Sequence, residues 1–444
     1  MSKHLHQSRL ALTNVLAEGG YTASVKLGSE AAKVNLIIDT GSSTLVVHHN
    51  RYQPDKDVDL RPTTLAQEVC YGLGGWLGAV IHTKVTTPYL HLHDTPLALV
   101  HREAEHTFMN ADGIWGLAYH KLNPSYDMGR YLQAHNVTPL TTYPWPFPDS
   151  DHPLCHQDFV DFKAILYTAP EQDVPTCFEL MEQHGLCANH FAFISRRSSI
   201  HYAHAEVEPH DIAADPLNQG WLILGGGEEH SQCYQGNFVD LKVVHDRYYN
   251  VNLLGVAVAG MPMIHAPTVQ EAHLNRGSSN AIIDTGASAL SLPESVFTPL
   301  IEQLISQVAN APSLLDPFTQ GGIESAHKAL QTGVDMAQLN LADWPDIEFY
   351  FEGASEVESE VADEPRIDNT QRAVLRCPPS TYWQINTPAY GKACFKLMGQ
   401  LPQWPAQSIL GLPLLNPYYV VFRRDEGDTG IVRFATVVDE VSAQ

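Results

Sequence analysis

Two aspartates at distant points of the chain have the residue type and setting to carry out chemistry. Asp39 ends the apolar run VNLIID at 34–39, and Asp284 ends AIID at 281–284. Each is followed by Thr-Gly. Charged side chains are seldom placed at the end of a core strand without a reason. A single Asp-Thr-Gly is typical of a simple turn, in which Gly supplies a positive φ. Two copies, each preceded by Ile-Ile, indicate a duplicated functional site.

Two carboxylates held a few ångströms apart can hydrolyse an amide without a metal or a nucleophilic side chain. Like charges at that distance do not ionise together, so the pair shares one proton. One member then acts as the base that activates water, and the other as the acid that protonates the leaving nitrogen. This chemistry requires a catalytic water and no other cofactor, and the titrating protons belong to the pair.

The residues beside the aspartates have supporting roles in this interpretation. The glycines let backbone N–H groups approach the carboxylates, and the threonine hydroxyls can join the two turns. The serine can donate to Asp39 and stabilise its charged form. These supporting residues are Thr40, Gly41, Ser42, Thr285 and Gly286.

The elements that position these residues also occur twice. ADGIWGLAY at 111–119 follows the first motif and QSILGLPLL at 407–415 follows the second, and each contains an apolar pair before Gly. Most other segments have the pattern of short strands separated by Gly, Asn or Pro. Helices are expected at 175–186, where Pro175 starts the helix and Gly185 closes it, and at 299–311. The pattern predicts a predominantly all-β protein with two lobes, each contributing one aspartate to a shared cleft.

Taken together, these motifs resemble those of the pepsin family of aspartic endopeptidases. The resemblance runs from Tyr21 to about Ala435 and includes LILGG at 222–226 and WPDIEFYFEG at 344–353 in the family's order. It implies a bilobal pepsin-like fold with two pseudo-symmetric β lobes, a central cleft and few short helices. It also implies hydrolysis of extended polypeptides between apolar residues, and inhibition by statine-type compounds.

The resemblance divides the chain into two lobes and adds a flap over the cleft. The N-terminal lobe is expected at 1–230, with an insertion at 121–176, and the C-terminal lobe at 231–444, with an acidic insertion at 352–368. The segment EVCYGLGGWLGAV at 68–80 matches the family's flap hairpin. Its substrate-binding residues are therefore expected to be Tyr71 and Gly72.

Several positions depart from the family pattern. Val46 replaces a Trp that bonds the flap tyrosine in many members, which predicts a looser flap or another partner. Ala287 stands where pepsin has a hydroxyl. Losing that donor is expected to raise the pKa values of the pair and to give a less acidic optimum. Because Asp39 lies near Met1, we expect no prosegment, as in the bacterial, shewasin-type branch of pepsin homologues.

Composition limits which binding partners and which cellular compartment are expected. The formal net charge of -24 argues against binding nucleic acid or an anionic membrane. No N-terminal stretch has the pattern of a signal peptide. The 7 cysteines are scattered singly, without the family's disulfide pairs, and pairing of Cys377 with Cys394 is left open by the sequence. These features predict a cytoplasmic monomer whose partner is a peptide or unfolded protein.

Three other interpretations compete with this one. The 23 histidines suggest a metal, and His91, His93, His101 and His106 are grouped, but no spacing fixes a third ligand, so no metal site is predicted. A self-associating half-size protease needs one motif per chain, whereas this chain has two. The main alternative is a catalytically weak or inactive pepsin-fold protein that binds peptides, which the looser flap favours and the two intact aspartates oppose.

Overall fold

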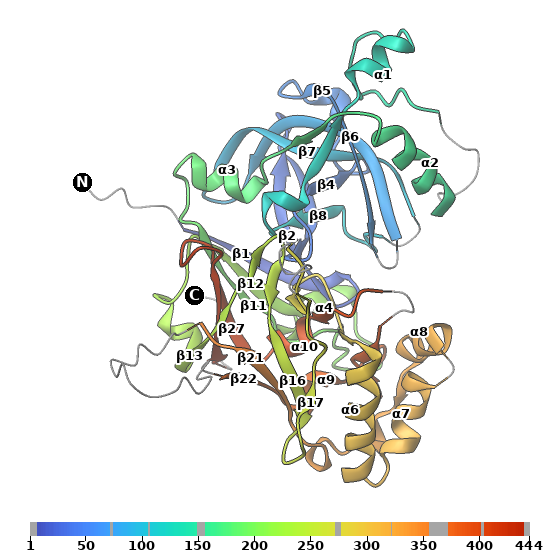
Figure 1. Ribbon diagram of the computed structural model, residues 1–444, viewed down its shortest axis with the longest axis vertical. Coiled ribbons are helices and arrows are strands. Elements are labelled where there is room, and N and C mark those ends of the chain that lie inside the picture. Colours follow the sequence, from blue (N-terminus) through green and yellow to red (C-terminus); the bar gives the residue numbers. More distant parts are fainter. Residues whose placement is uncertain are drawn as a thin grey trace. The chain divides into compact units, whose positions relative to one another are not determined.

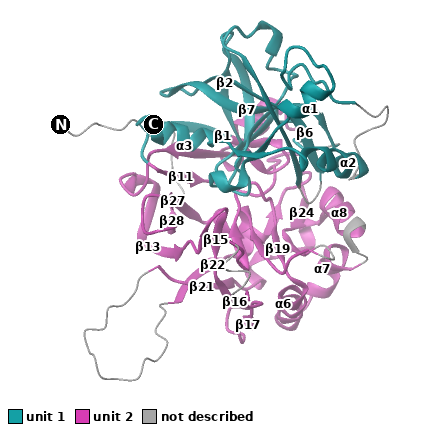
Figure 2. Cartoon of the chain, turned by 45° about the horizontal axis from the view of Figure 1, so that its top comes forward, with its two compact units in different colours: residues 1–12, 22–188 teal, residues 13–21, 189–444 magenta. Residues whose placement is uncertain are grey.

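In the computed structural model the chain divides into two compact units, coloured separately in Figure 2. The first unit comprises residues 1–12 and 22–188, and the second comprises 13–21 and 189–444. The predicted lobe boundary after residue 230 falls inside the second unit, because β11 (His190–Ile194) pairs with β27 (Tyr418–Arg423). The structure describes residues 7–71, 74–104, 107–148, 156–270, 277–320, 322–354, 372–400 and 404–438.

The first unit is built mainly from strands, in the order β10-β9-β5-β6-β7-β4-β8-β3-β2-β1 (Figure 1). Strand β6 is buried without a break from Trp76 to Ile81, as expected of a strand covered on both faces. The strands are β1 (Ser8–Ala17, of which 8–12 belong to this unit), β2 (Gly20–Leu27), β3 (Ala32–Asp39), β4 (Leu45–His48), β5 (Arg61–Tyr71), β6 (Gly74–Thr86), β7 (His91–Glu103), β8 (Gly113–Gly116), β9 (Pro124–Asp127) and β10 (Glu171–Asp173). The helices are α1 (Gly129–Ala134), α2 (His156–Leu166) and α3 (Cys177–Gln183).

The second unit contains four groups of paired strands: β12-β11-β27-β28-β13, β14-β15-β18-β26-β19-β25, β17-β16-β21-β22 and β20-β24-β23. Besides β11 and β27, the strands are β12 (Gln219–Leu224), β13 (Tyr234–Lys242), β14 (His245–Asp246), β15 (Tyr249–Val251), β16 (Leu253–Val258), β17 (Ile264–His265), β18 (Ala281–Ile283), β19 (Leu290–Leu292), β20 (Val334–Asp335), β21 (Ile347–Glu352), β22 (Arg372–Cys377), β23 (Trp383–Ile385), β24 (Lys392–Phe395), β25 (Leu397–Gly399), β26 (Ser408–Leu410) and β28 (Ile431–Val437).

Helices in the second unit are mostly short. Three of them, α6, α7 and α8, follow one another and lie side by side (Figure 1). The helices are α4 (Pro209–Ala214), α6 (Glu294–Gln307), α7 (Ala311–Thr319), α8 (Gly322–Thr332), α9 (Pro379–Tyr382) and α10 (Leu412–Leu415). The chain is thus mainly β with few helices, and the prediction of a predominantly β, pepsin-like fold is confirmed.

Local predictions can be compared with these elements. The apolar stretch 252–264 contains the mostly buried strand β16, which pairs with β17, whose two residues are not buried. The helix expected at 299–311 was placed wrongly, because α6 begins at Glu294 and contains Pro299. Val296 and Phe297 are buried and their N–H groups donate to the Pro293 carbonyl, so apolar packing extends the helix upstream.

The two predicted insertions differ in what the structure describes of them. Residues 121–176 include β9, α1, α2 and β10, whereas the proline-rich part at 141–148 forms no helix or strand. The insertion packs on the sheet through an apolar cluster, whose buried members are Ala66, Leu77, Met128, Leu132, Phe147, Phe162 and Leu166. Most of the acidic insertion at 352–368 lies outside the described residues, from 355 onward.

Helix α3 matches the prediction at 175–186 and has a complete capping box. The Thr176 hydroxyl accepts from the Glu179 N–H, and the Glu179 carboxylate accepts from the Thr176 N–H at 3.0 Å. Thr176→Ala removes one half of this exchange and is expected to destabilise the first unit by about 1 kcal/mol. Chemical denaturation of the two proteins measures the difference, and an unchanged midpoint would contradict the assigned cap.

Candidate active site

Asp39 lies at the carboxyl end of β3, where a parallel neighbour holds the turn in place. β3 pairs with β8 so that Asp39 lies opposite Gly116, and the Leu117 N–H donates to the Asp39 carbonyl at 2.7 Å. Asp39 is only 7% exposed. Burial of a carboxylate is costly unless donors surround it, so the polar groups of the turn are decisive.

Two donors within the turn bind the Asp39 carboxylate. The Gly41 N–H donates to Oδ1 at 2.7 Å, and the Ser42 hydroxyl donates to Oδ2 at 2.5 Å. Both oxygens therefore have a partner that favours the ionised form. Gly41 and Ser42 donate to Asp39 as the sequence predicts. The contact predicted for the Thr40 hydroxyl stays a prediction.

Asp284 follows β18 in the second unit in a closely similar arrangement. Its N–H donates to the Leu410 carbonyl at 3.1 Å, and its Oδ1 accepts from the Gly286 N–H at 2.8 Å. Thr285 is fully buried, as Thr40 is in the first turn. The turns differ at the next position, where Ala287 has no hydroxyl to offer the carboxylate.

The strands that carry the two aspartates repeat the same connectivity. In the first unit the order is β7-β4-β8-β3, and in the second it is β25-β19-β26-β18. In both, the outer pairs are parallel and the central pair is antiparallel. The repeat found in the sequence is therefore a repeat of local topology.

Close backbone approach explains the Gly that follows the apolar pair in each repeat. A β-carbon at Gly116 would lie 2.5 Å from the carbonyl carbon of Ser43, and one at Gly411 would lie 2.3 Å from the Ala287 oxygen. Only Gly fits between the aspartate turn and the strand that supports it. Each glycine thus fixes the position of the turn in its own unit.

A polar network after the first motif was not predicted from the sequence. The Ser43 hydroxyl donates to the Tyr119 carbonyl at 2.6 Å, and the Thr44 hydroxyl donates to Asn123 Oδ1 at 2.8 Å. Asn123 also accepts from the Gln67 side chain at 2.9 Å. This buried network ties the Asp39 turn to β5, and its members lie too far apart in the sequence for spacing to reveal them.

Strands β5 and β6 form the hairpin predicted to be the flap, and are here called the flap hairpin. Tyr71 is the last residue of β5 and pairs with Gly74, the first residue of β6. The other predicted flap residue, Gly72, lies outside the described residues. Val46, at the position of the missing Trp, is fully buried in β4.

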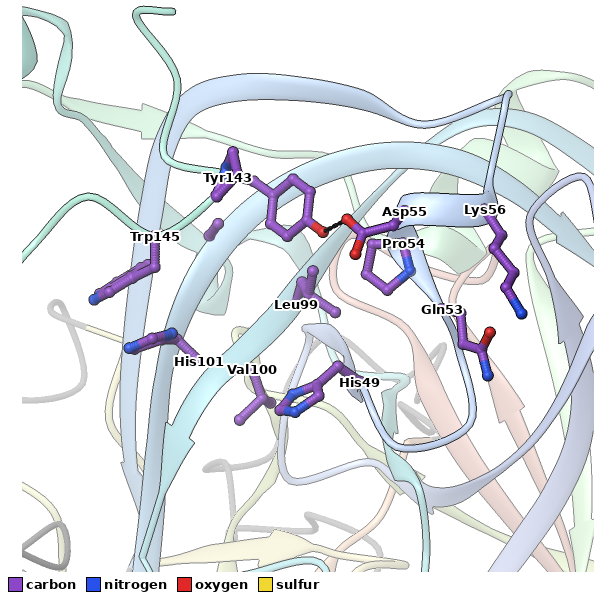
Figure 3. Close-up of a pocket in the computed structure, with 12 residues that line it drawn as sticks. His49, Gln53, Pro54, Asp55, Lys56, Leu99, Val100, His101, Tyr143 and Trp145 are labelled. Carbon is purple, nitrogen blue, oxygen red and sulfur yellow. Dashed lines mark hydrogen bonds between the residues drawn. The ribbon is translucent and has the colours of Figure 1, made fainter. Parts of the chain in front are cut away.

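The described part of the chain contains a cavity of about 510 Å³ in the first unit (Figure 3). Its lining includes Leu99 and Val100 of β7 and Tyr143 and Trp145 of the insertion, but none of the predicted site residues. Across the described residues, no group of three His, Cys, Asp or Glu side chains has the arrangement of a metal site. No helix there is both long enough and apolar enough to cross a membrane.

The two cysteines that were considered as a disulfide pair are free thiols. Cys377 Sγ lies 3.0 Å from the Thr381 hydroxyl, and Cys394 Sγ lies 3.3 Å from the Leu330 carbonyl oxygen. Both side chains are buried, and burial raises the pKa of Cys377 to about 12 and that of Cys394 to about 11. Neutral buried thiols of this kind are poor nucleophiles and pack as small apolar groups.

The repeated strand order and the two aspartate turns define a class of protein. A model of the eukaryotic aspartyl protease family matches residues 20–138 and 212–436, which is most of the chain. The chain therefore belongs to the aspartyl protease family. It is also similar to pepsin II-1 of Oryctolagus cuniculus, with 22% identity over 303 residues that cover 65% of this chain. The similarity spans 59% of the length of that relative.

Proposed function

We propose that this protein is an aspartic endopeptidase that hydrolyses peptide bonds in extended polypeptides. The observation that carries the proposal is the duplicated turn, in which a backbone N–H donates to Oδ1 of Asp39 and of Asp284 from within matching strand orders. Family membership supports the same conclusion. Two carboxylates with equivalent supports are what a shared-proton dyad requires.

In this proposal Asp39 and Asp284 hold one water and share one proton. The ionised carboxylate takes a proton from the water as its oxygen attacks the scissile carbonyl carbon, which gives a tetrahedral diol. The protonated partner stabilises the carbonyl oxygen as it develops charge and gives it its proton, which completes the diol. As the C–N bond breaks, one carboxyl group gives a proton to the leaving nitrogen and a hydroxyl of the diol returns a proton to the other, so the dyad is again singly protonated.

The substrate and the remaining features of the reaction are also proposals. Tyr71 and Gly72 close over the substrate and exclude water, and apolar residues flank the cleaved bond. The reaction needs the catalytic water and no other cofactor. A statine-type inhibitor is expected to bind in place of the diol, and we expect a cytoplasmic monomer acting on peptides or unfolded proteins.

The difference between Ser42 and Ala287 gives a pair of reciprocal variants. Ser42→Ala removes a donor that favours the ionised pair, so the acid side of the pH–activity profile should move up by about 1 pH unit. Ala287→Ser supplies a donor and should move it down by a similar amount. The profile of kcat/KM for a peptide substrate measures both shifts. Equal profiles for the three proteins would contradict the role assigned to these hydroxyls.

A pH series of cleavage of an unfolded protein, from about 3 to 7.5, tests the proposed activity. Cleavage that a statine-type inhibitor blocks supports the proposal. Binding of the inhibitor by a folded protein that cuts nothing at any pH would favour the peptide-binding alternative.

A further inference from the structure

Helix α2, within the insertion at 121–176, packs on the flap hairpin, chiefly on β5, in the first unit (Figure 1). Phe159 is 3% exposed, and a β-carbon at Gly75 would lie 2.8 Å from its ring. Gly75 is the second residue of β6, beside the tip of the hairpin. The aromatic ring thus fills the space next to the hairpin where any larger residue would clash.

An ion pair joins the same helix to the other strand of the hairpin. Lys163 Nζ lies 3.3 Å from Glu68 Oε2, and the Glu68 side chain is 3% exposed. Glu68 Oε1 is buried and has no hydrogen-bond partner among the described residues. Burial raises the pKa of Glu68, and the charge of Lys163 opposes that rise. Lys163 is therefore the main group that compensates a buried carboxylate on β5.

A third contact reaches β7. Arg102 lies opposite Leu77 of β6, and its guanidinium approaches Asp158 of α2 to 3.7 Å. Side chains of α2 thus contact three neighbouring strands. Phe159 and Lys163 are four residues apart and share one face of the helix, and Asp158 directly precedes Phe159.

The rest of the insertion holds α2 in place. Figure 3 shows Trp145 stacked on His101 of β7, with ring centroids 4.8 Å apart, and the Tyr143 hydroxyl bonded to Asp55 at 2.8 Å. Trp145 also packs on Phe162 of α2, at 5.3 Å. An unbroken series of ring contacts therefore runs from the sheet to the helix.

The same insertion pairs with the edge of β5 that faces away from β6. β9 pairs with Leu65 and Ala66, and the Thr142 hydroxyl donates to the Leu65 carbonyl at 2.5 Å. The edge of the hairpin near its base is thus bonded, while α2 packs nearer its tip. Because a paired and covered edge opens less readily than a free one, the hairpin is expected to be held rigidly.

We propose that α2 braces the flap hairpin, which makes Phe159 and Lys163 positioning residues for substrate binding. The kinetic part of this inference rests on the proposed endopeptidase function, whereas the bracing itself does not. The brace supplies the support for the flap hairpin that a Trp at the position of Val46 would give. Phe159 and Lys163 lie between the two segments that match the family model, 20–138 and 212–436, so this support belongs to this chain's own insertion.

Hydrogen exchange of the full chain tests the brace without requiring activity. Phe159→Ala should speed amide exchange about tenfold or more in 67–71 and 74–77, and leave β27 and β28 unchanged. Lys163→Met should act in the same direction, and Lys163→Arg should restore protection. Val160→Ala is the matched control, because Val160 lies on the same helix and is 44% exposed. Unchanged exchange in the hairpin, or the same increase throughout the first unit, would overturn the proposal.

Peptide cleavage by the same variants tests the kinetic consequence. A loosened flap hairpin should bind the substrate less tightly in the ground state and the transition state alike. KM should therefore rise about three- to tenfold while kcat changes less than about twofold. A fall in kcat without a change in KM would overturn the positioning role. If the wild type cleaves nothing, the proposed function fails, and the exchange comparison still decides whether α2 braces the hairpin.

Discussion

Asp39→Asn is expected to reduce kcat/KM for an unfolded protein substrate by about a thousandfold or more, while the fold stays intact. The amide keeps the size of the carboxylate and can accept from the Gly41 N–H, so the turn keeps one of its two bonds. It cannot take a proton from water, because an amide nitrogen is not basic. Cleavage assays at the optimum pH measure the loss, and near-UV circular dichroism checks the fold.

The control for this variant is Asp173→Asn. Asp173 is an exposed carboxylate in β10 of the same unit, and the same chemical change there should leave cleavage within about twofold of the wild type. Full activity in Asp39→Asn would show that another residue is the base. Equal losses of kcat/KM in both variants would mean that the loss of one negative charge, and not its position at Asp39, causes the effect.

Gly411→Ala is expected to cause a large loss of stability, about 3 kcal/mol or more in the second unit. The added β-carbon would lie 2.3 Å from the Ala287 oxygen and 2.4 Å from the Ala289 oxygen. Both are backbone atoms, which cannot move aside as the end of a flexible side chain can. The turn after Asp284 would have to shift, so activity should fall as well. Calorimetry of the two proteins measures the change.

Gly236→Ala is the comparison that separates the clash from the backbone conformation. Gly236 has φ of +78°, and no atom lies within 4 Å of the added β-carbon. The cost there is that of a left-handed residue alone, about 1 kcal/mol. A loss in Gly411→Ala no larger than in Gly236→Ala would mean that the close approach does not fix the turn.

The fold and the two turns were accessible from the sequence for specific physical reasons. Ile-Ile before each aspartate indicates a buried strand, and the following Gly allows an N–H to turn back to the carboxylate. These are local effects, so the sequence alone suffices to assign donor roles to Gly41, Gly286 and Ser42. The second element of each repeat was recognisable because only Gly fits beside the turn, at Gly116 and Gly411.

The insertion could be located from the sequence, but its structure was largely missed. The prolines at 141–148 are consistent with the irregular chain observed there, because they lack a backbone donor and break helices. Phe159, Phe162 and Leu166 have the spacing of one helical face, a signal that was present and overlooked. The Glu68–Lys163 pair could not have been found, because 95 residues separate its members and the pairing arises only from packing of α2 on the sheet.

The most direct test of the central claim compares Asp39→Asn, Asp284→Asn and the variant that carries both changes. If the two aspartates act as one dyad, each single change removes the whole function, and the double variant should be no slower than either single variant by more than about tenfold. Losses that multiply to about a millionfold would mean that the carboxylates act independently. Wild-type activity in either single variant would contradict the shared dyad outright.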